Sequence, residues 1–178
     1  MKKGFLAGCF SAVFLALSSC QKEGVFPVPP PVENMDWKRY LGKWYEIARY
    51  PNFFQQEGSS AIAEYLPDKR DPGKILVINS VVDKEGRKIF SIEGKGLLLP
   101  EKEKTGLLRV SFQWPFYGEY RIIFLSEDYR ISIVTSSAGK FLWILSRTPH
   151  LSEEKKKEIL LFLQENGFSV EKLFWDRH

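Results

Sequence analysis

Cysteine and histidine are scarce in this chain of 178 residues, which has two of each. Both cysteines, Cys9 and Cys20, fall within the first twenty residues, so the rest of the chain has no thiol for a disulfide, for nucleophilic catalysis or for a thiolate metal site. The histidines, His150 and His178, stand apart and form no evident triad or metal cluster. We therefore expect no catalytic residue, no metal and no cofactor, and an enzyme is the weaker hypothesis.

A concentrated basic patch is also lacking. The formal net charge is +4, but Lys and Arg are interleaved with Asp and Glu along the chain. Proteins that bind nucleic acid gather their positive charge on one face, so we expect no nucleic-acid partner. The length and the apolar fraction of 44% are typical of a single folded domain.

Long hydrophobic runs are confined to the start of the chain. Residues 1–19 contain Lys2 and Lys3, then the apolar run "GFLAGCFSAVFLAL", which is shorter than the roughly 20 residues of a membrane-spanning helix. The following "LSSC" resembles the signal of bacterial lipoproteins, in which cleavage precedes a cysteine whose sulfur is acylated. The resemblance makes Cys20 the lipidated first residue of the mature chain and its membrane anchor. The alternative is an ordinary secretory signal beside an unrelated cysteine.

Residues 20–35 predict a tether between this anchor and a domain at residues 36–178. The segment "QKEGVFPVPPPVENM" carries four prolines and no helical or strand period, which favours an extended chain. If about ten of its residues extend at roughly 3.1 Å each, they hold the domain about 30 Å from the anchor. By resemblance to enterobacterial lipoproteins, Gln21 after the cysteine favours the bacterial outer membrane. Which face of that membrane carries the protein stays open.

From Asp36 onward, short runs of alternating apolar and polar residues are separated by Gly, Pro, Asp and Asn. This pattern is typical of antiparallel strands. We expect strands at residues 43–50, 59–66, 74–82, 88–98, 106–113, 118–125, 129–136 and 140–147. The fold class is therefore all-β, either a sandwich or an eight-stranded up-and-down barrel, whose interior can hold one small ligand.

The period changes after the eighth strand. The stretch "HLSEEKKKEILLFLQENGF" predicts one amphipathic helix with Ser152 as its N-cap and Gly167 at its end. Its apolar face needs a surface to cover, and we expect that surface on the outside of the barrel, at Tyr45, Ile47, Leu142 and Ile144. The tail "SVEKLFWDR" predicts a short final strand.

Strand parity brings two distant residues together. In a closed meander with an even number of strands, the start of the first and the end of the last meet at one end of the barrel. Trp44 begins the first strand and Arg147 ends the eighth, so the guanidinium is expected to lie on the indole face at the floor.

At this point the chain resembles the lipocalin family. The resemblance rests on "GKW" at 42–44, on "ILSRTP" at 144–149 and on the order of eight strands followed by a helix, and it covers about residues 36–176. "YLGKWYEIAR", "VSFQWPFYGEY" and "FLWILSRTP" are similar to the bacterial outer-membrane and apolipoprotein D branch. One motif departs, since the family's Thr-Asp-Tyr turn before strand seven is here Ser126, Glu127 and Asp128. The resemblance implies a barrel floor built on Gly42, Trp44 and Arg147.

The interior face gives the candidate ligand-binding residues. Parity and the resemblance together assign the ligand site to Trp143, Tyr65, Phe112, Tyr120, Ile122 and Ala63, with Phe54 at the rim. The alternative at each position is a side chain that only fills a packed core. In the first strand, parity turns Glu46, Ala48 and Tyr50 inward and Tyr45, Ile47 and Arg49 outward. A buried carboxylate must find a partner or take up a proton, so we expect a structural bond for Glu46 near the floor.

The open-end loops hold aromatic residues, namely Phe53, Phe54, Trp114, Phe116 and Tyr117. They either pack locally or form an apolar rim that gates an acyl chain or touches a bilayer. The first hypothesis for the whole chain is a membrane-anchored protein that binds a fatty acid, a lysophospholipid or a similar small amphiphile. The alternative is a structural or partner-binding lipoprotein with a filled barrel.

Overall fold

The computed structural model describes residues 27–53, 55, 60–71, 73–83, 85–136 and 138–176, and it confirms the eight predicted strands. They are β1 (Gly42–Arg49), β2 (Ser60–Pro67), β3 (Lys74–Val82), β4 (Lys88–Leu98), β5 (Leu107–Gln113), β6 (Phe116–Leu125), β7 (Ile131–Thr135) and β8 (Leu142–Ser146). A ninth strand, β9 (Phe174–Trp175), confirms the short strand predicted in the tail. The other elements are α1 (Trp37–Tyr40), α2 (Glu153–Glu165) and the 3-10 turns η1 (Pro100–Lys102) and η2 (Val170–Lys172).

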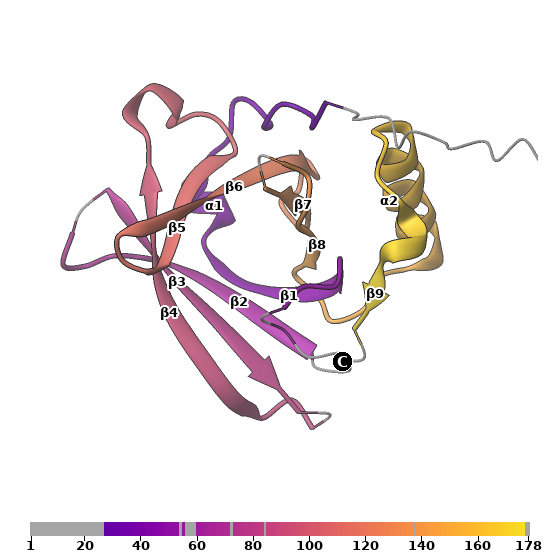
Figure 1. The fold of residues 1–178 in the computed structure, drawn as a ribbon, viewed down its shortest axis with the longest axis horizontal. Helices are drawn as coiled ribbons and strands as arrows, with labels where there is room; N and C mark the ends of the chain where they lie inside the picture. The colour runs from indigo at the N-terminus through magenta and orange to yellow at the C-terminus, as the bar shows by residue number, and fades with distance from the viewer. Residues whose placement is uncertain are drawn as a thin grey trace, which may run out of the picture.

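The strands form a closed antiparallel barrel, so the barrel is correct and the sandwich is not (Figure 1). Each strand pairs with its neighbour in sequence, and β1 pairs with both β2 and β8. Closure is incomplete along the strands, because β1 pairs with β2 only through residues 42–45 and β4 pairs with β5 only through residues 95–98. The floor end is therefore sealed, while β2 and β4 separate from these neighbours toward the open end.

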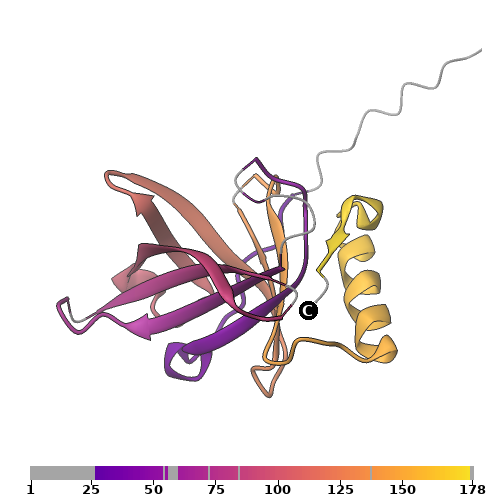
Figure 2. The same ribbon diagram turned by 90° about the horizontal axis from the view of Figure 1, so that it is seen from below.

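Helix α2 covers the outside of the barrel, as predicted (Figure 2). Ser152 caps it by accepting a hydrogen bond from the Lys155 amide, and Gly167 follows its end with a φ of 76° that favours glycine. Ile159 and Leu163 are buried in one cluster with outward side chains of β1 and β8, including Ile47, Leu142 and Ile144. In the described part of the chain, no helix is both long and apolar enough to cross a membrane.

Arg147 and Trp44 build the floor. The guanidinium carbon lies 3.8 Å from the indole centroid, which is the stacking that parity predicted. The same side chain donates to five backbone carbonyls at 2.8 to 3.2 Å, those of Arg39, Tyr40, Leu41, Lys43 and Tyr129. Gly42 has a φ of 97°, and a β-carbon there would lie 3.4 Å from an Arg147 terminal nitrogen. The three motif residues therefore hold the entry to β1 against the end of β8.

The turn between β6 and β7, where the family motif departs, is well bonded. Ser126 Oγ donates to Asp128 at 2.6 Å and accepts from the amides of Arg130 and Ile131. Tyr129 takes a left-handed φ of 59°, and the Arg39 guanidinium lies 3.9 Å from its ring centroid. The altered triplet thus keeps the turn joined to the floor through side-chain hydrogen bonds and this stacking.

The prediction for the far half of β1 was wrong. A β-bulge between Glu46 and Ala48, where β1 pairs with β8, reverses the alternation. Ala48 and Tyr50 therefore join the outer cluster under α2, and Arg49 lies opposite Trp143 on the inner side. Tyr45, Ile47 and Glu46 keep their predicted faces.

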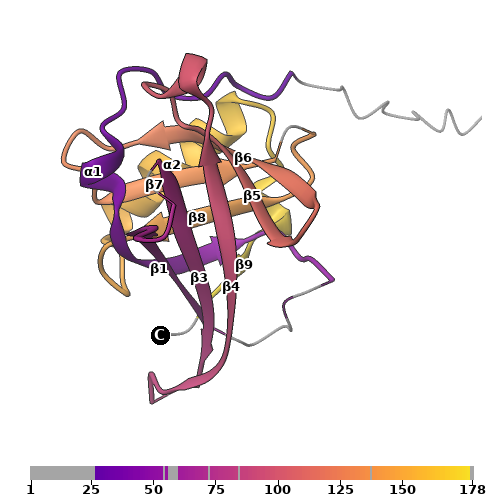
Figure 3. The same cartoon turned by 90° about the vertical axis from the view of Figure 1, so that its left-hand side faces the viewer.

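The described chain starts on the barrel wall, so part of the predicted tether belongs to the domain (Figure 3). Gly106 and Ile122 flank Val32, whose carbonyl accepts from the Gly106 amide at 2.7 Å and whose amide donates to the Ile122 carbonyl at 2.9 Å. Met35 is buried in the inner core cluster. Residues 28–35 of the proposed tether therefore lie against the domain, and residues 20–26 lie outside the described residues together with the leader.

Candidate functional site

The bottom of the barrel interior is filled by aromatic side chains. Tyr40 packs on Trp44 with a centroid distance of 4.7 Å and on Tyr65 at 5.3 Å. The hydroxyls of Tyr65, Tyr120 and Tyr40 form a chain with O···O distances of 2.7 Å, which continues to Ser132 at 3.2 Å. Tyr65 and Tyr120 were predicted on the inner face, but no feature of the sequence pointed to their hydrogen bonds.

The tyrosine chain is electrically neutral. Burial raises the pKa of Tyr40 to about 12 and raises the pKa values of Tyr65 and Tyr120 well above their usual range. Each hydroxyl therefore keeps its proton near neutral pH and can act as a donor or as an acceptor within the chain. A ligand that reached the floor would meet the faces of these rings and hydroxyls that are already hydrogen-bonded. The protonated tyrosines act there neither as a base nor as a nucleophile.

Trp143 stands above the floor on β8, stacked on Phe141 with a centroid distance of 5.8 Å. Its indole N–H points to the side-chain carbonyl of Gln55 at 3.4 Å. The Gln55 amide in turn donates to both carboxylate oxygens of Glu46, at 3.0 and 3.3 Å. A polar bridge therefore links the β1–β2 loop to Trp143 and to the inner face of β1.

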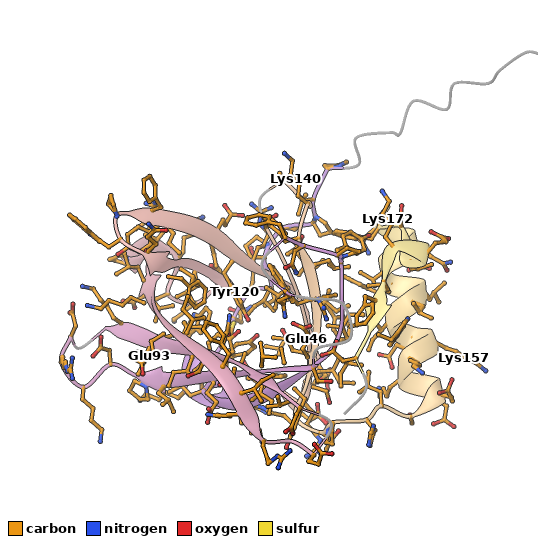
Figure 4. The ribbon with its side chains drawn as sticks, turned by 60° about the horizontal axis from the view of Figure 1, so that its bottom comes forward. Glu46, Glu93, Tyr120, Lys140, Lys157 and Lys172 are labelled. Carbon is orange, nitrogen blue, oxygen red and sulfur yellow. The ribbon has the colours of Figure 1, made fainter. Side chains whose placement is uncertain are left out.

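Glu46 lies in the interior of the molecule (Figure 4). It belongs to a buried charge cluster. Arg49 donates to Glu46 at 2.9 Å and to Asp176 at 2.8 Å, and the three side chains are at most 6% exposed. Asp176 also accepts from the Ala61 amide at 3.1 Å, and its own amide donates to the Ile47 carbonyl. Asp176 thus bridges β1 and β2 at the point where these two strands separate. The structural bond expected for Glu46 exists, but it lies along the wall and not at the floor.

Two acids share one cation in this buried cluster, and burial is the main reason that both of their pKa values are raised. Burial, and then the charge of Asp176, raise the pKa of Glu46 to about 7. Burial is also the main cause that raises the pKa of Asp176 to about 6, against the hydrogen bond from Ala61 and the charge of Arg49. A proton held by the acids near neutral pH removes the excess negative charge.

We expect the domain to be more stable at pH 5 than at pH 8. An acid whose pKa is raised by folding binds more protons in the folded state, so its stabilising effect is complete below its unfolded pKa and is lost as pH rises through its folded pKa. For Glu46 this window runs from 4.5 to about 7, which corresponds to about 3 kcal/mol at 1.36 kcal/mol per pKa unit. Guanidinium unfolding at the two pH values measures the difference.

Glu46→Gln should flatten this pH profile and raise stability at pH 8, because the amide keeps a hydrogen-bonding group but carries no charge. Glu93→Gln is the matched control, since Glu93 is an exposed residue of β4. Equal pH profiles in Glu46→Gln and wild type would show that Glu46 does not titrate in this window.

The upper inner wall is apolar and open to solvent. Val77 of β3 belongs to the inner core and lies opposite Gly94 of β4, so alternation turns Ile92 and Phe90 inward as well. Nevertheless Phe90 is 61% exposed and Ile92 40%. Solvent therefore reaches the inner face of this half of the barrel.

Phe112 of β5 completes this wall and is 39% exposed. A β-carbon on Gly94 would lie 2.7 Å from the Phe112 ring, and one on Gly96 would lie 2.8 Å from Leu108 Cδ2. The two glycines of β4 thus leave the space that the side chains of β5 occupy. Sequence alternation turned Phe112 inward, as observed, whereas Phe90 and Ile92 were not among the candidate ligand residues.

The remaining candidates fall into three groups. Ala63 is half-buried on β2, opposite Trp44, and packs against the inner core. Ile122 is fully buried among residues of the floor. Phe54 lies outside the described residues. Among the residues that the structure describes, no cluster of three His, Cys, Asp or Glu side chains is placed to hold a metal ion.

Comparison with known proteins agrees with this architecture. The model of the lipocalin-like domain family matches residues 35–178. The outer membrane lipoprotein Blc of Citrobacter freundii is 41% identical over 153 residues, which cover 84% of this chain and 85% of that protein. Blc of Escherichia coli K12 is 38% identical over 174 residues, 96% of this chain and 94% of that protein.

A more distant relative and a solved structure extend the likeness. Apolipoprotein D of Bos taurus is 33% identical over 177 residues, which cover 94% of this chain and 88% of that protein. Insecticyanin from the tobacco hornworm Manduca sexta is similar in structure, with a TM-score of 0.65 over 84% of each chain. Its 24% identity supports the fold alone.

Proposed function

Because the chain belongs to the lipocalin family and groups with its bacterial outer membrane lipoproteins, we propose that it binds a fatty acid, a lysophospholipid or a similar small amphiphile inside the barrel. Such binding would serve storage or transport of the ligand at the cell envelope. Family membership itself supports only the coarser statement that the ligand is small and hydrophobic.

One observation carries the proposal, namely the apolar inner wall that solvent reaches above a filled floor. Phe90, Ile92 and Phe112 present this wall, and an acyl chain that covers them would remove apolar surface from water. At the floor the hydroxyls of Tyr65 and Tyr120 are hydrogen-bonded to each other at 2.7 Å, so an apolar chain end can lie there without breaking a hydrogen bond. The filled floor limits how deep that chain reaches.

Energetics favour a binder of moderate affinity and broad selectivity. Each buried methylene contributes about 0.8 kcal/mol, so ten contribute roughly 8 kcal/mol before the cost of ordering the ligand is subtracted. Roughly 8 kcal/mol corresponds to a dissociation constant of about 1 μM, so after the ordering cost we expect a constant in the micromolar range or weaker. Chain lengths that differ by one methylene would be poorly discriminated.

The anchor is the second part of the proposal. The leader at residues 1–19 and the cysteine at position 20 support cleavage before Cys20 and acylation of its sulfur. Stable attachment needs more than one lipid chain, and a lipoprotein cysteine carries two or three. The barrel would then remain on the outer membrane while ligands enter and leave it.

Saturable binding of a fluorescent fatty acid tests the ligand. The chain from residue 20 with Cys20→Ser keeps every described contact and carries no lipid, and it is titrated after delipidation with a dansyl-labelled undecanoic acid. We expect one site of micromolar affinity, displacement by lysophospholipid, and quenching of tryptophan fluorescence. Trp143→Phe should remove most of that quenching, because Trp143 stands on the inner side of β8.

Trp175→Phe is the matched control, since Trp175 packs in the outer cluster with Lys156 4.9 Å from its ring centroid. Its quenching should match that of wild type. A folded chain that shows no saturable binding would favour a partner-binding lipoprotein with a filled barrel. Equal quenching in the two variants would place the probe outside the barrel.

A further inference from the structure

The described chain begins at the open end of the barrel, and this position bears on how the domain faces the membrane. Glu33 forms a β-bridge with Thr105 at the floor end. From there the segment passes Arg121, whose side chain donates to the Pro29 carbonyl at 3.2 Å, and reaches Gly139 between β7 and β8. Val28 Cγ2 lies 3.2 Å from the position of a β-carbon on Gly139. The chain toward Cys20 therefore leaves the domain at the open end (Figure 3).

The chain between anchor and domain is short. Seven peptide units join Cys20 to Pro27, and a fully extended chain spans at most about 3.6 Å per residue, so the anchor lies within about 25 Å of the open end. A strand of eight residues, such as β1, is itself about 26 Å long at roughly 3.3 Å per residue. A segment of this length that ran back along the barrel would span the barrel only as far as the floor end, and no residues would be left to reach a membrane beyond it. The anchor thus favours an orientation with the open end toward the membrane.

The open end also carries exposed apolar side chains, which we call the rim: Phe53, Ile89, Trp114 and Phe116. They are 92%, 67%, 81% and 73% exposed, and they come from the β1–β2 loop, the start of β4 and the β5–β6 hairpin. Among the described residues with large exposed apolar side chains, only Leu66 lies near the floor end and only Leu161 on α2. Apolar exposure among these residues is therefore concentrated at the open end.

Charge at the open end is compatible with a lipid surface. Lys140 is exposed next to Gly139, where the described chain starts, and the exposed Lys172 lies on the same side of the molecule, so two lysines face one exposed acid there, Glu171 (Figure 4). Lysine attracts anionic headgroups, and tryptophan is favoured at the boundary between headgroups and acyl chains. A bilayer therefore fits the rim better than a soluble partner, because the anchor already holds one within reach.

We propose that the rim docks on the bilayer that carries Cys20, so that the mouth of the barrel faces lipid. The proposal rests on the anchor and the amphiphile binding proposed above. In this orientation an acyl chain passes between bilayer and inner wall with little exposure to water. Phe90, Ile92 and Phe112 continue the apolar surface from the rim into the barrel.

Flotation with vesicles tests the docking. The lipid-free chain from residue 20 with Cys20→Ser is mixed with vesicles of phosphatidylethanolamine and phosphatidylglycerol in a 3:1 ratio, and the bound fraction gives a partition coefficient. The double variant Phe53→Ser, Trp114→Ser should lower that coefficient at least tenfold. The control Leu66→Ser, Leu161→Ser removes two exposed apolar side chains elsewhere and should change it less than twofold.

The fatty-acid titration in solution separates the two proposals. The rim variant should keep its affinity for the dansyl probe, because neither Phe53 nor Trp114 belongs to the inner wall. Equal partition of the two double variants, or a wild-type chain that does not float, would overturn the docking. Loss of probe binding in wild type would overturn the ligand proposal and leave the vesicle result to stand separately.

Discussion

Arg147→Ala is expected to lower the free energy of unfolding by about 3 to 5 kcal/mol, because the substitution leaves carbonyl groups of the floor without a donor. The side chain serves five backbone carbonyls from α1, β1 and the β6–β7 turn, and it stacks on Trp44. The Tyr40 carbonyl keeps a second donor, the indole N–H of Trp44 at 2.8 Å, whereas the other four lose their bond to Arg147. Guanidinium unfolding of the lipid-free chain measures the loss.

Two further variants separate the charge of Arg147 from its shape. Arg147→Lys keeps a cation over Trp44 but has one nitrogen in place of a planar fork, so we expect it to recover less than half of the loss. Arg109→Ala is the control, because Arg109 stacks on Tyr117 at 5.3 Å on the exposed side of β5, and it should cost less than about 1 kcal/mol. A similar cost for Arg147→Ala and Arg109→Ala would mean that the floor does not depend on its arginine.

Much of this fold could be predicted because its signals are local. Alternation placed each strand boundary within two residues of the observed one, and Ser152 and Gly167 marked the ends of the helix region. The contact between Arg147 and Trp44 spans most of the chain, yet it follows from counting strands. Where apolar and polar residues alternate regularly, the alternation and the number of strands predict which distant residues meet in the barrel.

The errors come from features that break the period or bring distant segments together. One β-bulge in β1 turned Arg49 inward and Ala48 outward, and no residue type in "EIAR" announces it. Asp176 lies 127 positions from Arg49, so its role in the wall could not be inferred from spacing. The same holds for residues 28–35, whose prolines suggest a free tether although the segment bonds to β6.

The two ends of the barrel follow from these arrangements. At the floor, Trp44, Tyr40 and Tyr65 fill the interior and Arg147 ties the surrounding backbone together. Toward the open end the strands separate, and apolar side chains that alternation turns inward become accessible. A binding barrel needs both properties, because the closed end holds the shape while the open end leaves apolar surface for the ligand.

The second large effect is expected in the charge cluster of the wall. Arg49→Met should lower the free energy of unfolding by about 3 to 5 kcal/mol at pH 8, because it leaves Glu46 and Asp176 buried without their cation. At pH 5 the loss should be smaller, since both acids have raised pKa values, about 7 and about 6, and can be neutralised by protons. Unfolding at the two pH values measures this difference.

A triple variant decides whether charge or packing is the cause. Replacing Arg49 by Met together with Glu46→Gln and Asp176→Asn removes all three charges while nearly preserving volume, so most of the stability lost at pH 8 should return. Because Gln55 joins Glu46 to Trp143, the dansyl titration of Arg49→Met should also show changed tryptophan quenching. A stability loss that is equal at pH 5 and pH 8 and is not recovered in the triple variant would assign the role of Arg49 to packing, since buried charge would then cost nothing.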